Sequence, residues 1–370
     1  MNQTREDNWD STFISANGFN GFRSHYNEVF KSESFERIFV IKGGPGTGKS
    51  SLMKKIRDRY KKENIRIESI YCSSDPSSLD GLILTREETK IGLVDGTAPH
   101  ERDAIFPGVT DEIINLGEGL EHDELFGSKH EIRRLSNYKK IAYKNGYGLL
   151  RISGEAIRTY HDIYPCSDIY SWAVSFCSEF IREKSARLQR DEQLGFSSAF
   201  SRFGKSVLSE NLPRKRDYIL RGNGFTEYAA TRALKSALRD NNVHFSAMPS
   251  PLSDDLIDII ITPEFKIYAH SMLRDSFIFD DGITPIPYSD KTIAATFIDL
   301  PDTAYKSGDS SASMLPSIYS QLLSDAARHF EEAASYHLAL EKIYSTAMDF
   351  SVADRYYDYI TSKIDSILRI

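Results

Sequence analysis

The residues of this sequence best suited to chemistry lie in one glycine-rich stretch. It combines the glycines, the lysine and the hydroxyl side chains that phosphate binding requires, and its residues are Gly43, Gly44, Pro45, Gly46, Thr47, Gly48, Lys49, Ser50 and Ser51. Glycine lets the backbone curl so that its N–H groups point at phosphate oxygens, where a Cβ would be in the way. Lys49 would neutralise the β- and γ-phosphates, and Ser50 would place its hydroxyl on Mg²⁺. The stretch therefore predicts binding of ATP or ADP together with Mg²⁺.

Strand and helix signals flank this glycine loop (residues 43–51). The apolar run at residues 38–41 is typical of a buried strand, and apolar side chains then recur at helical spacing to about residue 62. A helix that begins at the loop points its positive end at the phosphates. Strand, loop and helix in this order are the context that a phosphate-binding loop needs.

A second apolar strand supplies the expected metal ligand. Residues 91–94 are apolar and lead directly to Asp95. In proteins with a phosphate loop, an Asp at the end of such a strand holds Mg²⁺ directly or through water. We therefore expect Asp95 and Ser50 to share the ion. Whether the strand of Asp95 lies beside the strand before the loop or one position further out divides kinase-like from ATPase-like proteins, and the sequence leaves this open.

Asp75 is the first candidate for orienting the attacking water, because it follows the strand predicted for residues 65–72. Its alternative role is to cap a short helix, since Asp75 is followed by a proline and we expect a helical turn over residues 76–80. The weaker candidates for the water-orienting role are Asp80, His100 and Glu101.

Composition limits the class of protein. The 370 residues are 40% hydrophobic and 27% charged, which is typical of a soluble globular chain. No apolar run approaches the roughly 18 residues of a membrane span, and the polar first residues lack the apolar core of a signal peptide, so we expect a cytoplasmic protein without membrane contact. The net charge of −7 argues against nucleic acid as the main partner.

The aromatic residues that precede the loop suggest one further contact. Phe19, Phe22, Tyr26 and Phe30 recur three or four positions apart, which predicts a short helix with an aromatic face within residues 15–35. That face would pack against the sheet or, alternatively, stack on adenine.

The second half of the chain repeats the first in degraded form. Gly222 lies 179 residues after Gly43 (222 − 43), again between an apolar strand and a helix, and later segments match at similar offsets. On this alignment Glu227, Tyr228 and Ala229 replace Gly48, Lys49 and Ser50. The cation and the Mg²⁺ hydroxyl are therefore missing, and the carboxylate of Glu227 is expected where phosphate would bind. Residues His270 and Ser271 are the nearest equivalents of Asp95.

This repeat predicts two domains of α/β class. The first is a P-loop NTPase domain over residues 1–190, with a core at about 15–120 and a helical segment at about 121–190. The second is an inactive copy over residues 191–370, with a core at about 191–305 and a helical segment at about 316–370. Each core is expected to be a three-layer arrangement around a parallel sheet.

Four stretches carry a resemblance to a known family. They are Lys42–Ser50, Cys72–Asp75, Ser78–Gly81 and Asp95–His100. Together they resemble an uncharacterised bacterial family of tandem-repeat P-loop ATPases. Members of that family carry a phosphate loop in both halves, and this sequence departs from them in its second half.

Three functions are compatible with these patterns. The first is Mg²⁺-dependent ATP hydrolysis, with Lys49, Asp75 and Asp95 as catalytic residues. The second is a small-molecule phosphotransferase, in which Thr97, His100 and Arg102 would line the acceptor site. The third is a slow ATP-dependent switch that acts on a protein partner or within a homo-oligomer.

Overall fold

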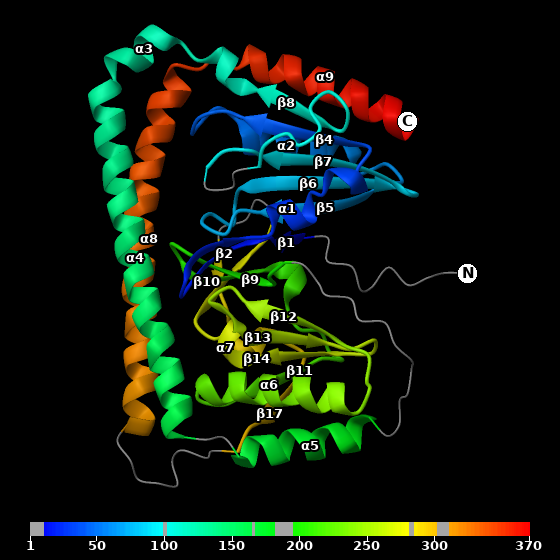
Figure 1. Ribbon diagram of the computed structural model, residues 1–370, viewed down its shortest axis with the longest axis vertical. Coiled ribbons are helices and arrows are strands. Elements are labelled where there is room, and N and C mark those ends of the chain that lie inside the picture. Colours follow the sequence, from blue (N-terminus) through cyan, green and yellow to red (C-terminus); the bar gives the residue numbers. More distant parts are fainter. Residues whose placement is uncertain (1–10, 99–101, 165–166, 182–194, 281–284, 302–310) are drawn as a thin grey trace. The chain divides into compact units, whose positions relative to one another are not determined.

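The computed structural model describes residues 11–98, 102–164, 167–181, 195–280, 285–301 and 311–370 (Figure 1). The chain packs as two compact units. The first unit comprises the residues up to Ile14, Ser24–Lys144 and Phe330–Ile370, and the second comprises Ser15–Arg23 and Asn145–His329. The domain boundary expected from the repeat, between residues 190 and 191, lies outside the described residues.

The first unit is built on a mixed six-stranded sheet in the order β1-β5-β6-β7-β4-β8. Its strands are β1 (Ser11–Phe13), β4 (Arg37–Lys42), β5 (Arg66–Tyr71), β6 (Leu79–Arg86), β7 (Thr89–Asp95) and β8 (Asp111–Asn115). Strand β6 is antiparallel to both neighbours, whereas the other pairs are parallel. The expected all-parallel sheet is therefore wrong at β6, because a two-residue turn joins β6 to β7 and so short a connection requires antiparallel strands.

Two local expectations were also wrong. The residues expected to form a helical turn at 76–80 instead lead into β6. The expected aromatic helix is two strands, β2 (Ser15–Gly18) and β3 (Gly21–Ser24), followed by the single turn α1 (Tyr26–Val29). Tyr26 and Phe30 are buried in the first unit's core, beside Ile38 and Val94, so these two rings pack rather than stack on a base.

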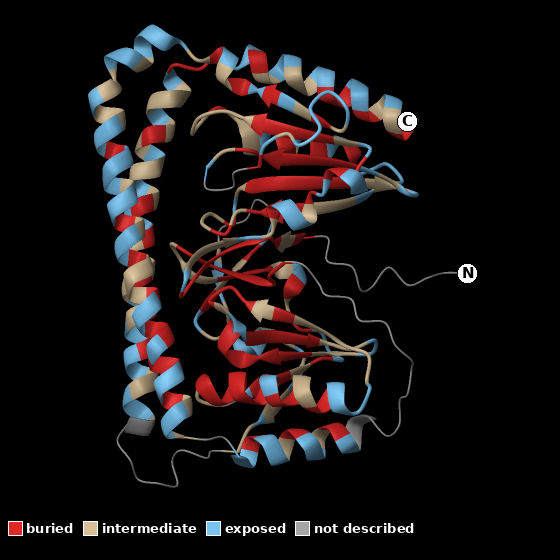
Figure 2. Cartoon of the chain, in the orientation of Figure 1, coloured by how far each residue is buried: buried red, intermediate tan, exposed pale blue. Residues whose placement is uncertain are grey.

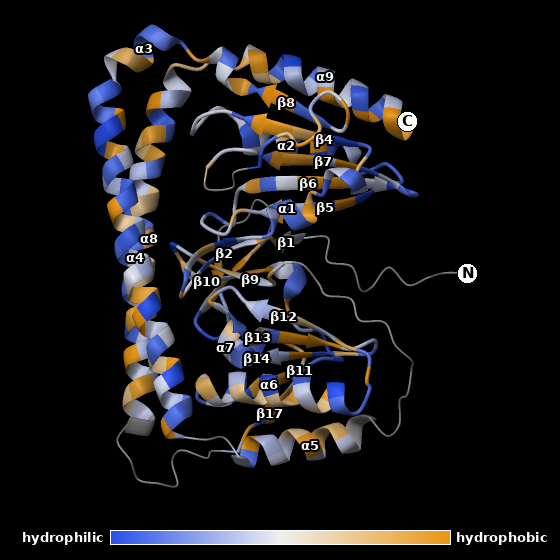
Figure 3. Cartoon of the chain, viewed as in Figure 1, coloured by the Kyte–Doolittle hydropathy of each residue, from blue (hydrophilic) through white to orange (hydrophobic). Residues whose placement is uncertain are grey.

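Helices complete the first unit. Helix α2 (Lys49–Tyr60) buries Leu52, Met53 and Ile56. The others are α3 (His122–Gly127), the part of α4 (Lys129–Ile163) up to residue 144, the part of α8 (Ser311–Thr346) from residue 330, and α9 (Ser351–Leu368). Short 3-10 turns lie at Ser32–Ser34 and Leu116–Gly119. Strands β4, β6 and β7 are largely buried and hydrophobic, whereas α9 alternates between buried and exposed residues (Figures 2 and 3).

The second unit contains a sheet of the same design. Strands β12 (Ser246–Ser250), β13 (Ser253–Ile261), β14 (Lys266–Ala269), β11 (Tyr218–Arg221) and β17 (Thr296–Asp299) follow one another in that order. Their directions match those of β5, β6, β7, β4 and β8, including the antiparallel second strand. Equal order and direction in five strands is the outcome that a duplication predicts.

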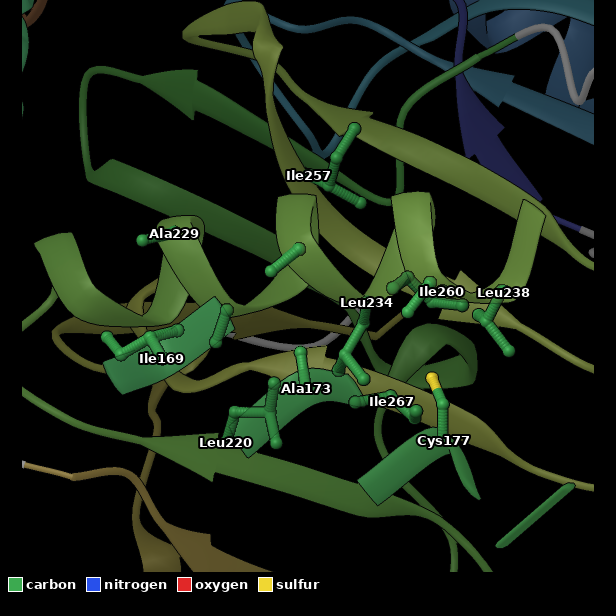
Figure 4. Packing of buried hydrophobic residues seen from close by; sticks show 13 residues of the cluster. Ile169, Ala173, Cys177, Leu220, Ala229, Leu234, Leu238, Ile257, Ile260 and Ile267 are labelled. Carbon is green, nitrogen blue, oxygen red and sulfur yellow. The ribbon is translucent and has the colours of Figure 1, made fainter. Parts of the chain in front are cut away.

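Helices α5 (Ser167–Ile181) and α6 (Phe225–Asp240) pack on this sheet through a core that includes Ala173, Leu220, Leu234 and Ile260 (Figure 4). A smaller sheet in the order β16-β15-β10-β9 joins Ile286–Pro287, Ser276–Phe279, Gly204–Leu208 and Ser198–Ser201. The remaining turns are α7 (His270–Leu273) and the 3-10 segments Ser209–Asn211 and Asp290–Thr292. Within the described ranges, no helix combines the length and the apolar character that crossing a membrane requires.

Candidate functional site

The glycine loop connects the end of β4 to the first residue of α2. Gly46 and Gly48 have φ values of 71° and 89°, the left-handed region that glycine adopts without strain. Gly48 is the N-cap of α2, so the loop ends where the helix exposes its unpaired N–H groups. The buried Thr47 donates from Oγ1 to the carbonyl of Gly44 at 2.9 Å, which fixes the curl of the loop. The backbone is thus shaped as an anion-binding turn requires.

Lys49 folds back over this loop. Its Nζ donates to the carbonyl oxygens of Gly43 at 3.1 Å and Gly44 at 2.9 Å. The same ammonium lies 3.8 Å from Oδ2 of Asp95, and only 12% of the lysine side chain is exposed. Lys49 and Asp95, which are far apart in the sequence, therefore lie close together in the structure.

Asp95 ends β7, the strand directly beside β4. Its Cα partner in the parallel ladder is Ile41, so no strand separates it from the strand before the loop. Oδ1 accepts hydrogen bonds from the backbone N–H of Thr97 at 2.8 Å and from its Oγ1 at 2.6 Å. Burial raises the pKa of Asp95, while the charge of Lys49 opposes the rise. A nearby cation favours the charged form of a buried carboxylate of this kind.

Ser50 lies in the first turn of α2, and its side chain contacts the first residue of β6. Its Oγ accepts a hydrogen bond from the N–H of Leu79 at 2.9 Å, which brings the hydroxyl to the residue before Asp80. Asp80 is 4% exposed and accepts from the hydroxyl of Tyr26 at 3.3 Å. Because Gly81 pairs with Val94, Asp80 lies opposite Asp95 at the same end of the two central strands β6 and β7. The charge of Asp80 raises the pKa of Asp95. The structure thus places Asp80, one of the weaker candidates for orienting water, next to Asp95.

Asp75 organises the turn that precedes β6. Its Oδ1 accepts from the N–H of Ser77 at 3.2 Å and from its Oγ at 2.7 Å, and its carbonyl accepts from Ser78 at 2.8 Å. The expected helix cap is wrong, because a strand rather than a helix follows. Orientation of water by the half-buried Asp75 stays a prediction, and His100 and Glu101 lie outside the described residues.

Arg102 is a structural residue rather than part of an acceptor pocket. Its side chain is fully buried and pairs with Asp111 at 3.2 Å. It also donates to the carbonyl of Phe30 at 2.7 Å and to Oγ of Ser32 at 2.9 Å. These bonds fasten the segment after β7 to the core, so Arg102 is not available to bind a substrate.

The C-terminal helices contact the glycine loop, which no local sequence signal indicated. A Cβ added to Gly46 would lie 2.5 Å from the carbonyl oxygen of Glu341, and one added to Gly44 would lie 3.0 Å from the ring of Tyr344. Both contacts come from α8. Gly44 and Gly46 therefore allow the loop to pack closely against α8, in addition to giving the loop its shape.

The corresponding loop of the second unit is occupied by a side chain of its own. Both oxygens of Glu227 accept backbone hydrogen bonds, from Gly222 at 2.8 Å and Ser271 at 2.7 Å. Arg274 lies 3.3 Å from the same carboxylate, whose side chain is fully buried. The carboxylate of Glu227 thus accepts a hydrogen bond from a backbone N–H of this loop. The register pairs Leu220 with Ala269, so Ala269, rather than His270 or Ser271, stands where the first unit has Asp95.

Among the residues that the structure describes, no three His, Cys, Asp or Glu side chains converge as a metal site. A magnesium ion bound beside a nucleotide needs only one or two carboxylates, since phosphate and water supply its remaining ligands. Ser50 and Asp95 offer a hydroxyl and one carboxylate, the types of oxygen ligand that this smaller requirement involves.

A comparison with known proteins covers this part of the first unit. A family model described as "Nephrocystin 3, N-terminal" matches residues 22–82, which include β4, the glycine loop and α2. No curated protein and no solved structure matches the chain. The chain is thus similar, over this segment, to the N-terminal region of nephrocystin 3.

Proposed function

We propose that the first unit binds ATP with Mg²⁺ at the glycine loop and hydrolyses it. The observation that carries the proposal is the position of Lys49. Its ammonium lies on the carbonyls of Gly43 and Gly44, at the N-terminus of α2, and 3.8 Å from Asp95. A lysine, a helix N-terminus and a buried carboxylate beside one glycine turn are the groups that a metal-bound triphosphate requires.

Each group has a role in this proposal. The loop N–H groups and Lys49 neutralise the phosphates, while Ser50 and Asp95 hold Mg²⁺. Bound Mg²⁺ would draw charge from the β- and γ-phosphate oxygens. A carboxylate orients the attacking water, and Asp75 and Asp80 are the candidates because both lie in the segment that Ser50 contacts. The second unit contributes no chemistry, since Glu227 fills its loop. Membership of the tandem P-loop family and a cytoplasmic location belong to the same proposal.

The test is release of ADP and inorganic phosphate from Mg²⁺-ATP by the unchanged protein, Lys49→Ala and Lys62→Ala. Lys62 is an exposed lysine just beyond α2 and serves as the matched control. Nucleotide binding is measured in parallel by thermal shift. We expect Lys49→Ala to lose binding and turnover, and Lys62→Ala to keep both. Equal thermal shifts for all three proteins would reject the site.

A second candidate function is transfer of the γ-phosphoryl group to a small molecule. The observation that favours it is the direct pairing of β7 with β4, the arrangement that we associated with kinase-like proteins. Hydrolysis yields ADP and phosphate in equal amounts, whereas transfer yields ADP without phosphate. Lys49-dependent ATP binding, little turnover alone and acceptor-dependent ADP release without phosphate would establish the transferase.

A further inference from the structure

One face of α8 lies against the glycine loop. His337, Glu341 and Tyr344 are spaced by four and three residues, so they share this face. The carbonyl of Glu341 adjoins Gly46, and the ring of Tyr344 adjoins Gly44. His337 is therefore one turn along the helix from the residue that contacts the loop.

Helix α4 brings a lysine to this histidine. Nζ of Lys139 lies 3.4 Å from Nδ1 of His337. One turn further along α4, Tyr143 packs against Phe330 of α8 with ring centroids 5.5 Å apart. Tyr143 also forms a hydrogen bond with Ser74, the residue before Asp75. The Lys139–Tyr143 face of α4 is thus directed at the segment between β5 and β6, which borders the candidate site.

Burial lowers the pKa of Lys139, while the charge of Glu341 opposes the fall. Burial, together with the charges of Lys139 and Lys49, lowers the pKa of His337 to about 4. His337 is therefore neutral near physiological pH and accepts a hydrogen bond from the ammonium of Lys139. Asp75 and Asp80 also act on His337 electrostatically, so the histidine lies within range of both carboxylates and of Lys49. Glu341, 3.5 Å from the other ring nitrogen, is the nearest anion on α8.

We propose that Lys139 binds the γ-phosphate of the nucleotide and stabilises the charge that develops on it during transfer, with His337 as its positioning residue. This is the part that a finger arginine from another subunit plays in other phosphoryl-transfer proteins, supplied here within one unit. The inference rests on the proposed function and deepens it. Loop, α2 and β7 supply one side of the site, and α4 and α8 supply a second cation.

The reaction step assigns no proton transfer to Lys139. The water oxygen forms a bond to the γ-phosphorus while the bond from phosphorus to the β–γ bridging oxygen breaks. ADP leaves with that electron pair, and the water proton passes through the orienting carboxylate to solvent. In the proposed role Lys139 donates hydrogen bonds from its ammonium, and the negative charge of the bound phosphate favours that charged form.

The test compares Lys139→Ala, Lys139→Met, Lys139→Arg and the control Lys140→Ala. Lys140 is the exposed neighbour on the same helix. We expect kcat to fall by about 10²- to 10³-fold in the Ala and Met variants, with little change in KM, and to recover partly in the Arg variant. His337→Gln should lower kcat by about tenfold, because it loosens the lysine without removing its charge.

Binding of the ADP–aluminium fluoride complex supplies a readout that does not depend on turnover. Lys139→Met keeps the aliphatic stem of the lysine, so it serves as the test variant if Lys139→Ala does not fold. We expect Lys139→Met to bind this analogue at least tenfold more weakly than the unchanged protein does, and to bind ADP alone with unchanged affinity. Equal weakening for both ligands, or unchanged kcat in an active protein, would reject the role of Lys139 alone. Failure of the unchanged protein to bind any nucleotide through Lys49 would instead reject the proposed function and this inference with it.

Discussion

The carboxylate of Glu227 accepts a hydrogen bond of 2.8 Å from the backbone N–H of Gly222, in the loop of the second unit that corresponds to the glycine loop. The sequence alignment places Gly48 of the first unit at the position of Glu227, and among the described residues no carboxylate bonds to the N–H groups of its loop. Glu227 thus supplies a negative charge to the loop of the second unit, whereas under the proposed function a bound phosphate would supply it in the first unit. The second loop keeps its shape by binding part of its own chain.

This relationship predicts the effect of removing the carboxylate. Glu227→Gln should destabilise the protein by about 1–3 kcal/mol. The NH₂ group of the glutamine would replace one carboxylate oxygen, and it cannot accept the hydrogen bond that the backbone N–H donates to that oxygen. Urea unfolding would measure the loss, with the exposed Glu210→Gln as the control. In Glu227→Gly, inorganic phosphate should restore stability by more than it stabilises the unchanged protein. No such difference would show that the loop is not an anion-binding turn.

Gly46 should tolerate no side chain. Its φ is +71°, and an added Cβ would lie 2.5 Å from the backbone oxygen of Glu341, which cannot swing aside. We expect Gly46→Ala to cost at least about 1–2 kcal/mol of stability and to abolish nucleotide binding. Gly148 of α4 is the matched control, because nothing lies within 4 Å of its Cβ position. Gly148→Ala should stabilise the protein by about 0.5–1 kcal/mol. A Gly46→Ala protein that melts and binds like the unchanged one would contradict the contact with α8.

The local part of the site was predictable from sequence, and the rest was not. Strand β4, the glycine loop, helix α2 and the acidic end of β7 follow from apolar runs and turn residues that lie next to one another. Strand β6 was missed because its turn to β7 is Glu87-Glu88, without the glycine or asparagine that usually marks a hairpin, although Glu87 adopts a φ of 54°. The place of Asp80 depends on that hairpin.

Contacts distant in sequence left no local signal. From the sequence, Glu341 and Tyr344 are predicted only to belong to a long amphipathic helix. Their contact with the glycine loop depends on how α8 packs. The sequence around Arg102 is typical of a polar loop, and no neighbouring residue indicates that Arg102 is buried against Asp111. Pairing across a fold is set by tertiary packing, which a one-dimensional pattern does not record.

The Arg102–Asp111 pair predicts a large loss when one partner is removed. Both side chains are fully buried, and Asp111 also accepts from the N–H groups of Ile105 at 2.7 Å and Phe106 at 2.8 Å. Arg102→Ala should therefore cost about 3–5 kcal/mol, because it leaves a buried carboxylate without its cation. Asp103→Asn, which alters an 89% exposed carboxylate paired with Lys42, should cost less than about 1 kcal/mol. Similar urea midpoints for the two variants would mean that the buried pair contributes no more than a surface one.

Asp258 predicts a specific dependence of stability on pH. The residue is 1% exposed on β13 and accepts a hydrogen bond from Ser198 at 2.8 Å. Burial raises its pKa from 3.8 to about 6, while the hydrogen bond and the charge of Lys205 oppose the rise. Between these two values the folded protein holds a proton that the unfolded chain has released, so the free energy of unfolding falls as pH rises through this window. The loss is complete above the folded pKa and amounts to about 3 kcal/mol at most.

Asp258→Asn should remove that dependence, because the amide cannot ionise. Relative to the unchanged protein, the variant should gain about 1–3 kcal/mol of stability between about pH 4 and about pH 7.5, measured as the difference between urea unfolding curves at the two pH values. The difference cancels the titration of all other groups, and the exposed Asp255→Asn should show none of it. If the relative stability of Asp258→Asn were the same at both pH values, Asp258 would titrate with the same pKa in the folded and unfolded protein, which would contradict the raised pKa.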